Sequence, residues 1–168
     1  AKVTPSEKVR FSLNIWWSAS NILVLDSRGK DLALPTASLL GNMLFATTGQ
    51  MASVKPDVLN WPLMESGFMA QGWDEASEMV AGYLQGRLAT ESIRSIWLMG
   101  ADALKALVSD QTILSELEEE GLERVIGRAV WLDDYALPAL ILPSLTSLLM
   151  EPSDKAVAWA ALQDFHRI

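Results

Sequence analysis

The sequence has no cysteine and a single histidine, His166, which lies two residues from the C-terminus. The absence of cysteine excludes disulfides, thiolate metal ligands, cysteine nucleophiles and iron–sulfur clusters. One histidine cannot form a metal site by itself, and its terminal position predicts that it is solvated. We therefore expect neither a metal nor a cofactor.

Long apolar runs are also missing, although half of the 168 residues are apolar. No run approaches the ~20 apolar residues that a membrane-spanning helix needs, so no membrane association is expected and the chain is predicted to be cytoplasmic. The chain starts at Ala1 without a signal-peptide pattern, which favours an excised C-terminal domain or a trimmed chain with further residues upstream. The length suits one domain, predicted over residues 11–168 after a flexible lead-in at 1–10.

Basic residues are few and unevenly placed. The 13 Lys and Arg against 21 Asp and Glu give a net charge of −8, with +2 in residues 1–60 and −10 in residues 61–168. A protein that grips DNA neutralises several phosphates with clustered Lys and Arg, and this chain has no such cluster. Strong nucleic-acid binding is therefore not expected, and a protein partner is favoured.

Strand patterns alternate with helix patterns along the chain. Residues 11–17 alternate with period two, which predicts a half-buried strand, and the apolar run at 21–26 predicts a second strand that pairs with it as a hairpin. Further strands are predicted at 56–62, 95–99, 124–132 and 136–142, and helices at 35–45, 74–89, 101–108, 114–120 and in the tail after 143. This order predicts a three-layer α/β/α sandwich with a central, mostly parallel sheet.

The C-terminal quarter carries the most specific pattern. An apolar strand at 139–142 breaks at Pro143-Ser144 into a short helix, and an Ala-rich helix with one tryptophan, Trp159, follows. This arrangement resembles the C-terminal end of the uracil-DNA glycosylase superfamily, in whose active families a histidine precedes the Pro-Ser and contacts the flipped base. Leu142 occupies that position here. A leucine cannot donate the hydrogen bond, so the resemblance implies the fold without the chemistry.

Three further stretches resemble the same superfamily in the same order. They are the strand, Gly-containing loop and helix over 21–45, the strand-Gly-helix step over 96–107 and the hairpin over 125–142, with an apparent insertion at about 65–90. The resemblance implies a degenerate pocket formed by Asp26, Ser27, Arg28, Gly29, Leu142 and Ser144.

The tail is also similar to the psi-subunit family of bacterial DNA polymerase III, a non-enzymatic relative. The stretches Leu-Pro-Ser-Leu-Thr-Ser-Leu at 142–148 and Ala-Trp-Ala-Ala-Leu at 158–162 carry this similarity. It implies a domain that docks on a chi-like subunit, with an N-terminal segment before Ala1 that reaches the clamp loader.

The candidate chemical residues each have a plainer interpretation. Asp26 or Asp31 is suited to orienting a water, but the first also suits the end of a strand and the second a solvated loop. Arg28 and Lys30 are either a remnant phosphate contact, a rim for an acidic partner or part of a solvated loop. Ser144 has no histidine nearby in sequence to serve as its base, so it is not expected to be a nucleophile.

Six of the seven tryptophans divide into two groups. Trp97, Trp131 and Trp159 fall on apolar faces and are predicted to be buried. The other group is less easily buried and suits a partner surface: Trp16, Trp61 and Trp73.

We expect a catalytically silent, psi-like interaction domain that binds its partner through Trp16, Arg28 and Lys30. The alternatives are a glycosylase-superfamily enzyme with a rearranged active site that acts on a modified base, and an uncharacterised glycosylase-fold domain of a larger protein.

Overall fold

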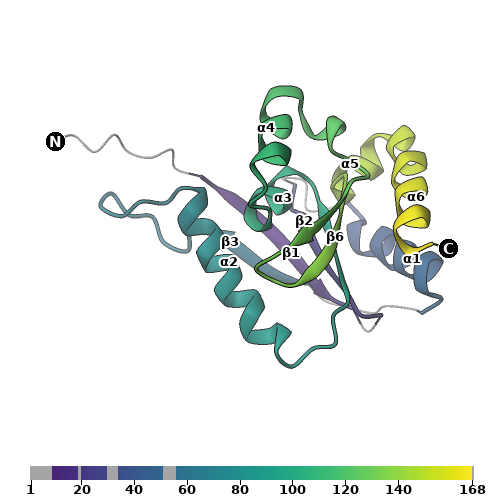
Figure 1. Ribbon diagram of the computed structural model, residues 1–168, viewed down its shortest axis with the longest axis horizontal. Helices are drawn as coiled ribbons and strands as arrows, with labels where there is room; N and C mark the ends of the chain where they lie inside the picture. The colour runs from purple at the N-terminus through teal and green to yellow at the C-terminus, as the bar shows by residue number, and fades with distance from the viewer. Residues whose placement is uncertain (1–8, 19, 30–33, 51–55, 168) are drawn as a thin grey trace.

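The computed structural model describes residues 9–18, 20–29, 34–50 and 56–167. Within these residues the chain forms one six-stranded sheet with helices around it (Figure 1). The strands are β1 (Phe11–Trp17), β2 (Ile22–Ser27), β3 (Asp57–Trp61), β4 (Ser95–Met99), β5 (Ala129–Leu132) and β6 (Leu137–Leu142). Lys30 and Asp31 lie outside the described residues, as does most of the predicted lead-in.

The helices follow most of the predicted positions. They are α1 (Thr36–Thr48), α2 (Trp73–Leu88), α3 (Ala101–Leu107), α4 (Gln111–Glu120), α5 (Leu145–Met150) and α6 (Pro152–His166), with a short 3-10 helix at Leu122–Arg124. Helix α4 begins before the predicted 114, because the Asp110 side chain accepts from the Thr112 and Ile113 amides and caps the helix. The 3-10 turn also shortens the strand predicted over 124–132 to the four residues of β5.

The sheet is mixed, with the strand order β3-β1-β2-β4-β6-β5. Strands β2, β4 and β6 are parallel neighbours, whereas the β3/β1, β1/β2 and β6/β5 pairs are antiparallel. The prediction of a mostly parallel sheet is therefore wrong for the pairing of neighbouring strands. The reason is the first hairpin, which inserts β1 between β3 and β2 although these two strands run in the same direction.

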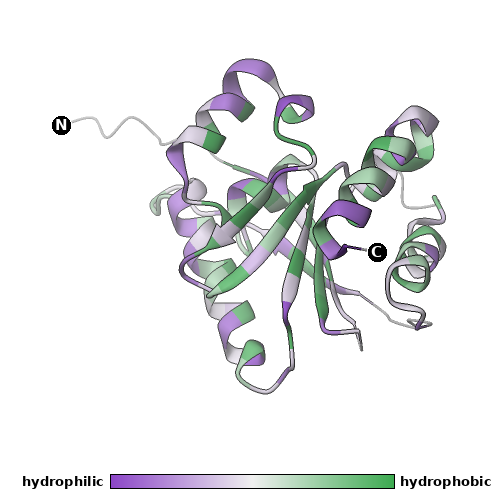
Figure 2. Cartoon of the chain, turned by 45° about the vertical axis from the view of Figure 1, so that its right-hand side comes forward, coloured by the Kyte–Doolittle hydropathy of each residue, from purple (hydrophilic) through white to green (hydrophobic). Residues whose placement is uncertain are grey.

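Helices cover both faces of the sheet, which confirms the three layers. One core cluster joins the sheet to α2, α3 and α4, and a second joins the opposite face to α1, α5 and α6. In Figure 1 the second group lies on the right of the sheet and α2 on the left. Figure 2 shows the apolar strands in green between helices that carry polar residues.

Three predictions about the burial of tryptophan side chains are wrong. Residues Phe11, Leu13, Ile15 and Trp17 of β1 face α2 as expected, but the other face of β1 is also covered. Trp16 is therefore buried in the second core cluster and cannot anchor a partner. Trp131 and Trp159, predicted to be buried, are exposed, because Trp131 lies on the edge strand β5 and Trp159 borders an apolar groove between α1, α5 and α6.

The predicted insertion at 65–90 is an integral part of one layer. It contains α2, whose Ala76, Val80 and Leu84 are fully buried against the sheet. Their spacing of four residues places them on one side of the helix, toward the face formed by β1. Helix α2 therefore covers this face together with α3 and α4.

Candidate functional site

Three loops meet at the carboxyl ends of β2, β4 and β6, where ligands bind in many open α/β sheets. The Leu145 amide donates to Asp26 Oδ1 at 2.9 Å, and the Ala103 amide donates to Ser27 Oγ at 3.1 Å. The Gly100 amide donates to the Leu142 carbonyl at 2.9 Å. The end of β2 is thus bonded to the starts of α3 and α5, which follow the other two strands.

Gly100 makes this close approach possible. Its φ of 94° is a conformation that side-chain-bearing residues rarely adopt. A Cβ at this position would lie 2.5 Å from Ser27 Oγ and 3.2 Å from the Ser144 Cβ. The loop after β4 therefore requires glycine for both its backbone conformation and its packing.

A small cavity of about 140 Å³ opens beside the end of β2. Its floor includes a row across three strands, because Asn14 of β1 pairs in register with Val58 of β3 and with Asp26 of β2. The remaining lining residues come from loops and from the starts of α1 and α5: Arg28, Gly29, Leu34, Thr36, Pro56 and Thr146. We call this the Asp26 cavity.

Asp26 is the carboxyl group at the site whose pKa differs most from its ordinary value. Its residue surface is 1% exposed. Burial raises the pKa of Asp26 from 3.8 to about 7, although the Leu145 N–H opposes this rise by favouring the carboxylate. Near neutral pH the group therefore exchanges between its acid and its carboxylate, as a proton donor or acceptor in a reaction must.

Leu142 lies where the resemblance places the base-contacting histidine. It is fully buried in the second core cluster, in register with Met99 of β4. Ser144, two residues later, caps α5 by accepting from the Ser147 amide at 3.1 Å. Both residues act structurally: one fills the core and the other starts a helix.

Arg28 and Gly29 form the rim of the site. The Arg28 amide donates to the Ser12 carbonyl at 2.9 Å, so the loop continues the pairing of β1 with β2. Gly29 lies against α5, because a Cβ there would be 2.9 Å from Thr146 Oγ1. Both rim residues also line a larger, shallower hollow of about 590 Å³ with Arg10, Phe11, Ser12, Asn60, Trp61 and Asp102.

The structure thus brings the predicted pocket residues together in two roles. Asp26, Arg28 and Gly29 line the cavity, while Ser27, Leu142 and Ser144 join the loops beneath it. Sequence reasoning missed three polar lining residues: Asn14, Thr36 and Thr146. The alternating pattern of residues 11–17 did place Asn14 on a defined face of the strand, but that face was predicted to be exposed to solvent.

The expectation that His166 is solvated is wrong. Trp97 Nε1 donates to His166 Nε2 at 3.0 Å, and the ring of Phe165 meets the imidazole edge to face. Burial lowers the pKa of His166, and its Nε2 must be unprotonated to accept this bond. The histidine therefore ties the end of α6 to β4 and lies outside the cavity lining.

Within residues 9–18, 20–29, 34–50 and 56–167, no three His, Asp or Glu side chains form a group able to hold a metal ion. In the same part of the chain, no helix has the length and apolar character needed to cross a membrane. Comparison with protein-family models, with curated proteins and with solved structures found no match in any of the three.

Proposed function

We propose that the protein is a non-catalytic interaction domain with a glycosylase-like fold, a cytoplasmic psi-like accessory subunit of the DNA polymerase III clamp-loader assembly. Its partners would be a chi-like subunit and the clamp loader. The observation that carries the proposal is Leu142, which is fully buried at the position from which a glycosylase would contact the base. An apolar side chain in the core can neither donate to a base carbonyl nor reach one.

The size of the Asp26 cavity supports the same function. Sites that enclose small ligands commonly have volumes of ~300–1,000 Å³. The cavity measures about 140 Å³. The cavity beside Asp26 is therefore smaller than such sites, and the hollow of about 590 Å³ that shares Arg28 and Gly29 with it does not include Asp26.

The charged side chains also favour a protein partner over DNA. Four arginines in the described chain are paired with carboxylates: Arg10 with Glu65, Arg87 with Asp57 and Glu91, Arg124 with Glu120, and Arg128 with Glu116. A phosphate contact by any of them would compete with the neighbouring acid. Counterion release, which drives DNA binding, is correspondingly weak for such a surface.

The proposal is tested by two assays on the purified chain. We expect no uracil release from single-stranded or duplex uracil-containing oligonucleotides above a buffer control. We also expect a saturable complex with a chi subunit by calorimetry, and no sub-micromolar complex with either oligonucleotide at ~50 mM salt, where electrostatic binding is strong. Uracil release, or DNA binding that is tight and weakens steeply with salt, would contradict the proposal.

One observation favours a second candidate function, an enzyme with a rearranged active site that acts on a modified base. Asp26 has a pKa raised to about 7 and lines the cavity beside Asn14. Such a carboxyl group is suited to general acid or base catalysis near neutral pH. Base release from oligonucleotides that carry alkylated or deaminated bases, abolished by Asp26→Asn, would establish this function in place of the first.

A further inference from the structure

The largest exposed apolar side chains of the described structure include four within a seven-residue loop between β3 and α2. Leu63 is 68% exposed, Met64 80%, Phe68 101% and Met69 74%. We call residues 63–69 the apolar loop. Scattered apolar residues are ordinary on a protein surface, but contiguous groups of large ones mark sites of interaction.

The apolar loop has a defined conformation. Gln71, which is itself buried, donates from Nε2 to the Met64 carbonyl at 2.7 Å and accepts from the Ser66 amide. Ser66 Oγ accepts from the amides of Phe68 and Met69 at 3.1 and 3.2 Å. These bonds fix the backbone that presents the side chains, which lowers the entropy lost when a partner binds.

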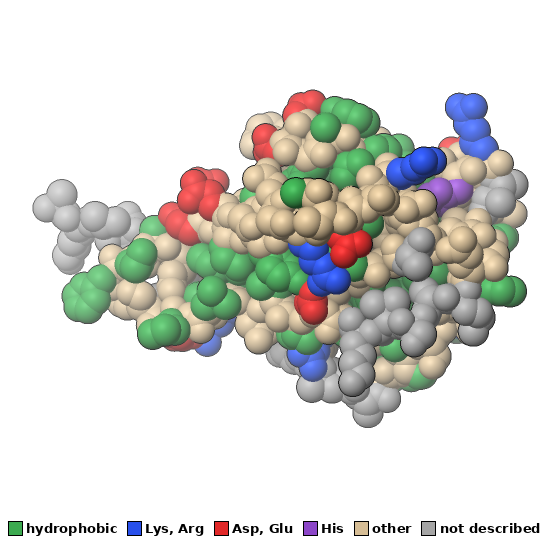
Figure 3. Space-filling model, turned by 90° about the horizontal axis from the view of Figure 1, so that it is seen from below, with side chains coloured by type: hydrophobic (Ala, Val, Ile, Leu, Met, Phe, Trp, Pro, Cys, Tyr) green, Lys and Arg blue, Asp and Glu red, His purple; other side chains and the backbone are tan. Residues whose placement is uncertain are grey.

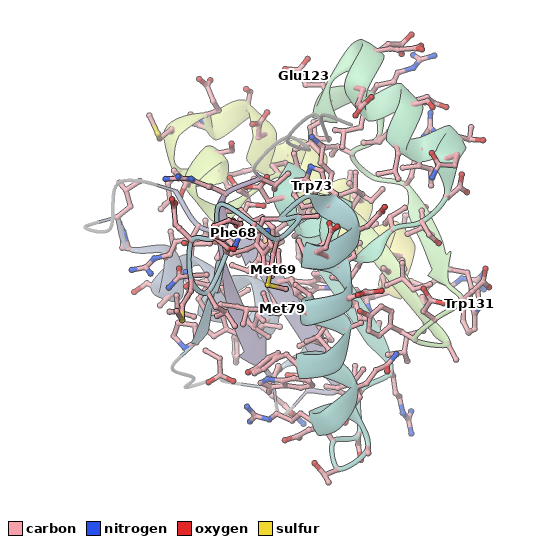
Figure 4. The ribbon with its side chains drawn as sticks, turned by 90° about the vertical axis from the view of Figure 1, so that its left-hand side faces the viewer. Phe68, Met69, Trp73, Met79, Glu123 and Trp131 are labelled. Carbon is pink, nitrogen blue, oxygen red and sulfur yellow. The ribbon has the colours of Figure 1, made fainter. Side chains whose placement is uncertain are left out.

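The surface continues from the loop onto the start of α2. Figure 4 shows Phe68, Met69, Trp73 and Met79 on one side of the molecule, along the loop and the helix that follows it. Trp73 stacks on Phe11 with ring centroids 5.1 Å apart, so this end of the surface rests on the core. Figure 3 shows hydrophobic side chains gathered at one narrow end of the molecule, next to acidic ones.

The charged residues that the apolar loop and its flanking segments supply are all acidic. Residues 56–86 contain five acidic and no basic residues: Asp57, Glu65, Asp74, Glu75 and Glu78. Asp74 and Glu78 are exposed in the first turns of α2. The cations that approach from elsewhere include Arg10, which is paired with Glu65, and Lys105, whose ammonium lies 5.4 Å from the centre of the Trp73 ring.

We propose that the apolar loop and the first turns of α2 form the docking surface for a basic amphipathic segment of a partner protein. The inference rests on the proposed function, because it names where an interaction domain meets its partner and what chemistry that partner has. Apolar side chains of the segment pack on Phe68 and Met69, and its Lys or Arg side chains face Asp74 and Glu78. An anionic membrane would repel the same acids, and a second copy would bring two acidic surfaces together.

The test uses a designed probe, an 18-residue helical peptide of leucine and lysine, with a leucine and glutamate peptide of the same pattern as its control. We expect saturable binding of the lysine peptide that weakens with salt, and no binding of the glutamate peptide. Phe68→Ser with Met69→Ser removes the apolar contact and should weaken binding at least tenfold, as hot-spot truncations do. Asp74→Asn with Glu78→Gln should weaken binding at ~50 mM salt and reduce its salt dependence.

Matched controls lie elsewhere on the surface. Phe45→Ser with Met150→Ser removes one exposed Phe (50%) and one exposed Met (68%) from the opposite helical layer, and Glu151→Gln with Asp164→Asn removes two exposed acids from the same layer. Neither pair should change the affinity for the lysine peptide. Equal losses for loop and control variants would overturn the inference. So would loop-dependent binding to phosphatidylcholine–phosphatidylglycerol vesicles, or loop-dependent dimers in sedimentation velocity, without binding of the lysine peptide.

A calorimetric arm with the chi subunit separates this inference from the proposed function. If chi binds the wild type and the Phe68→Ser/Met69→Ser variant equally, the proposed function stands and the docking surface is wrong. If chi binds neither while the lysine peptide still requires the loop, the docking surface stands and the psi-like assignment is wrong.

Discussion

The Asp26 cavity and the apolar loop differ in what each shows to solvent. At the cavity, the polar groups point inward: Asp26 is buried, and the loops around it are fastened to one another by backbone donors. At the loop the arrangement is reversed, because Gln71 and Ser66 bind the backbone from within while Phe68 and Met69 face outward.

This difference indicates which region suits which task. An enzyme site needs accessible polar groups around a space for the substrate, whereas a binding surface needs exposed apolar groups on a fixed backbone. The cavity has a titratable group but little space. The loop has no catalytic group but offers four large apolar side chains in a defined conformation.

The largest effect on the free energy of unfolding is expected from Asp26→Asn, which tests whether the cavity holds a buried carboxylic acid. The folded-state pKa of about 7 exceeds the ordinary aspartate pKa of 3.8, so between these two pH values the folded protein binds more protons than the unfolded chain. The protonated group stabilises the folded state below pH ~4, and this stabilisation, ~4 kcal/mol in total, is lost as the pH rises from ~4 to ~7. The asparagine variant keeps an oxygen that can accept from the Leu145 amide, but it has no carboxyl group to titrate. Denaturant unfolding from pH 4.5 to 9 should therefore show the variant gaining stability relative to wild type, and a constant difference would contradict the buried acid.

The next effect is expected from Gly100→Ala, which tests the close approach of the loops beneath the cavity. The added Cβ would meet Ser27 and Ser144 in a backbone conformation that alanine adopts with strain. Crowding and the left-handed backbone together should cost ~3 kcal/mol of unfolding free energy. Gly49→Ala is the control. Gly49 also has a positive φ, 75°, but no atom lies within 4 Å of the added Cβ. An equal loss for both variants would show that the loops are not in contact as described.

A smaller loss of ~2 kcal/mol is expected from Leu142→His, which restores the residue type of the active glycosylases. The change removes a fully buried apolar side chain from the second core cluster. Uracil release should stay at the buffer level, because residues 26–29, which resemble the first glycosylase motif only in a degenerate form, remain unchanged. Activity gained through this single change would show that the site had kept its remaining machinery.

The smallest effect on stability, ~1 kcal/mol, is expected from Gln71→Ala, which tests the internal support of the apolar loop. The change removes the hydrogen bonds to Met64 and Ser66. Amide hydrogen exchange at Phe68 and Met69 should accelerate, and the lysine peptide should bind more weakly although no contact residue has changed. Gln85→Ala, on the solvent side of α2, is the matched control and should leave both measurements unaltered.

Sequence patterns predicted the layers better than the surfaces. The alternation in β1 correctly placed Leu13 and Ile15 on one face, but it did not reveal that α1, α5 and α6 cover the other, so Trp16 was assigned to the surface. The same limitation explains Trp159, whose apolar neighbours along α6 suggested burial although its side chain is 38% exposed at the groove between α1, α5 and α6. Periodicity reports which residues share a face and leaves open what packs against that face.

The candidate site was predictable to a similar extent. The end of β2 and the Pro143-Ser144 break located the meeting point of the loops, since the carboxyl ends of parallel strands lie at one edge of a sheet. Asn14 and Thr146 were missed because they reach the cavity from a hairpin strand and from a helix, and their partners are distant in sequence. The apolar loop was missed because residues 65–69 fall within the predicted insertion, and exposure is a property of the folded chain.

The central claim is that the protein meets its partner through the apolar loop and not through the Asp26 cavity. Titration of the isotopically labelled protein with the leucine and lysine peptide, followed by amide chemical shifts, tests this claim most directly. We predict that the largest shifts fall on Phe68, Met69 and the first turn of α2, while Gly29 and Thr146 beside the cavity stay unchanged. Shifts centred on Gly29 and Thr146, with residues 63–69 unaffected, would contradict the account.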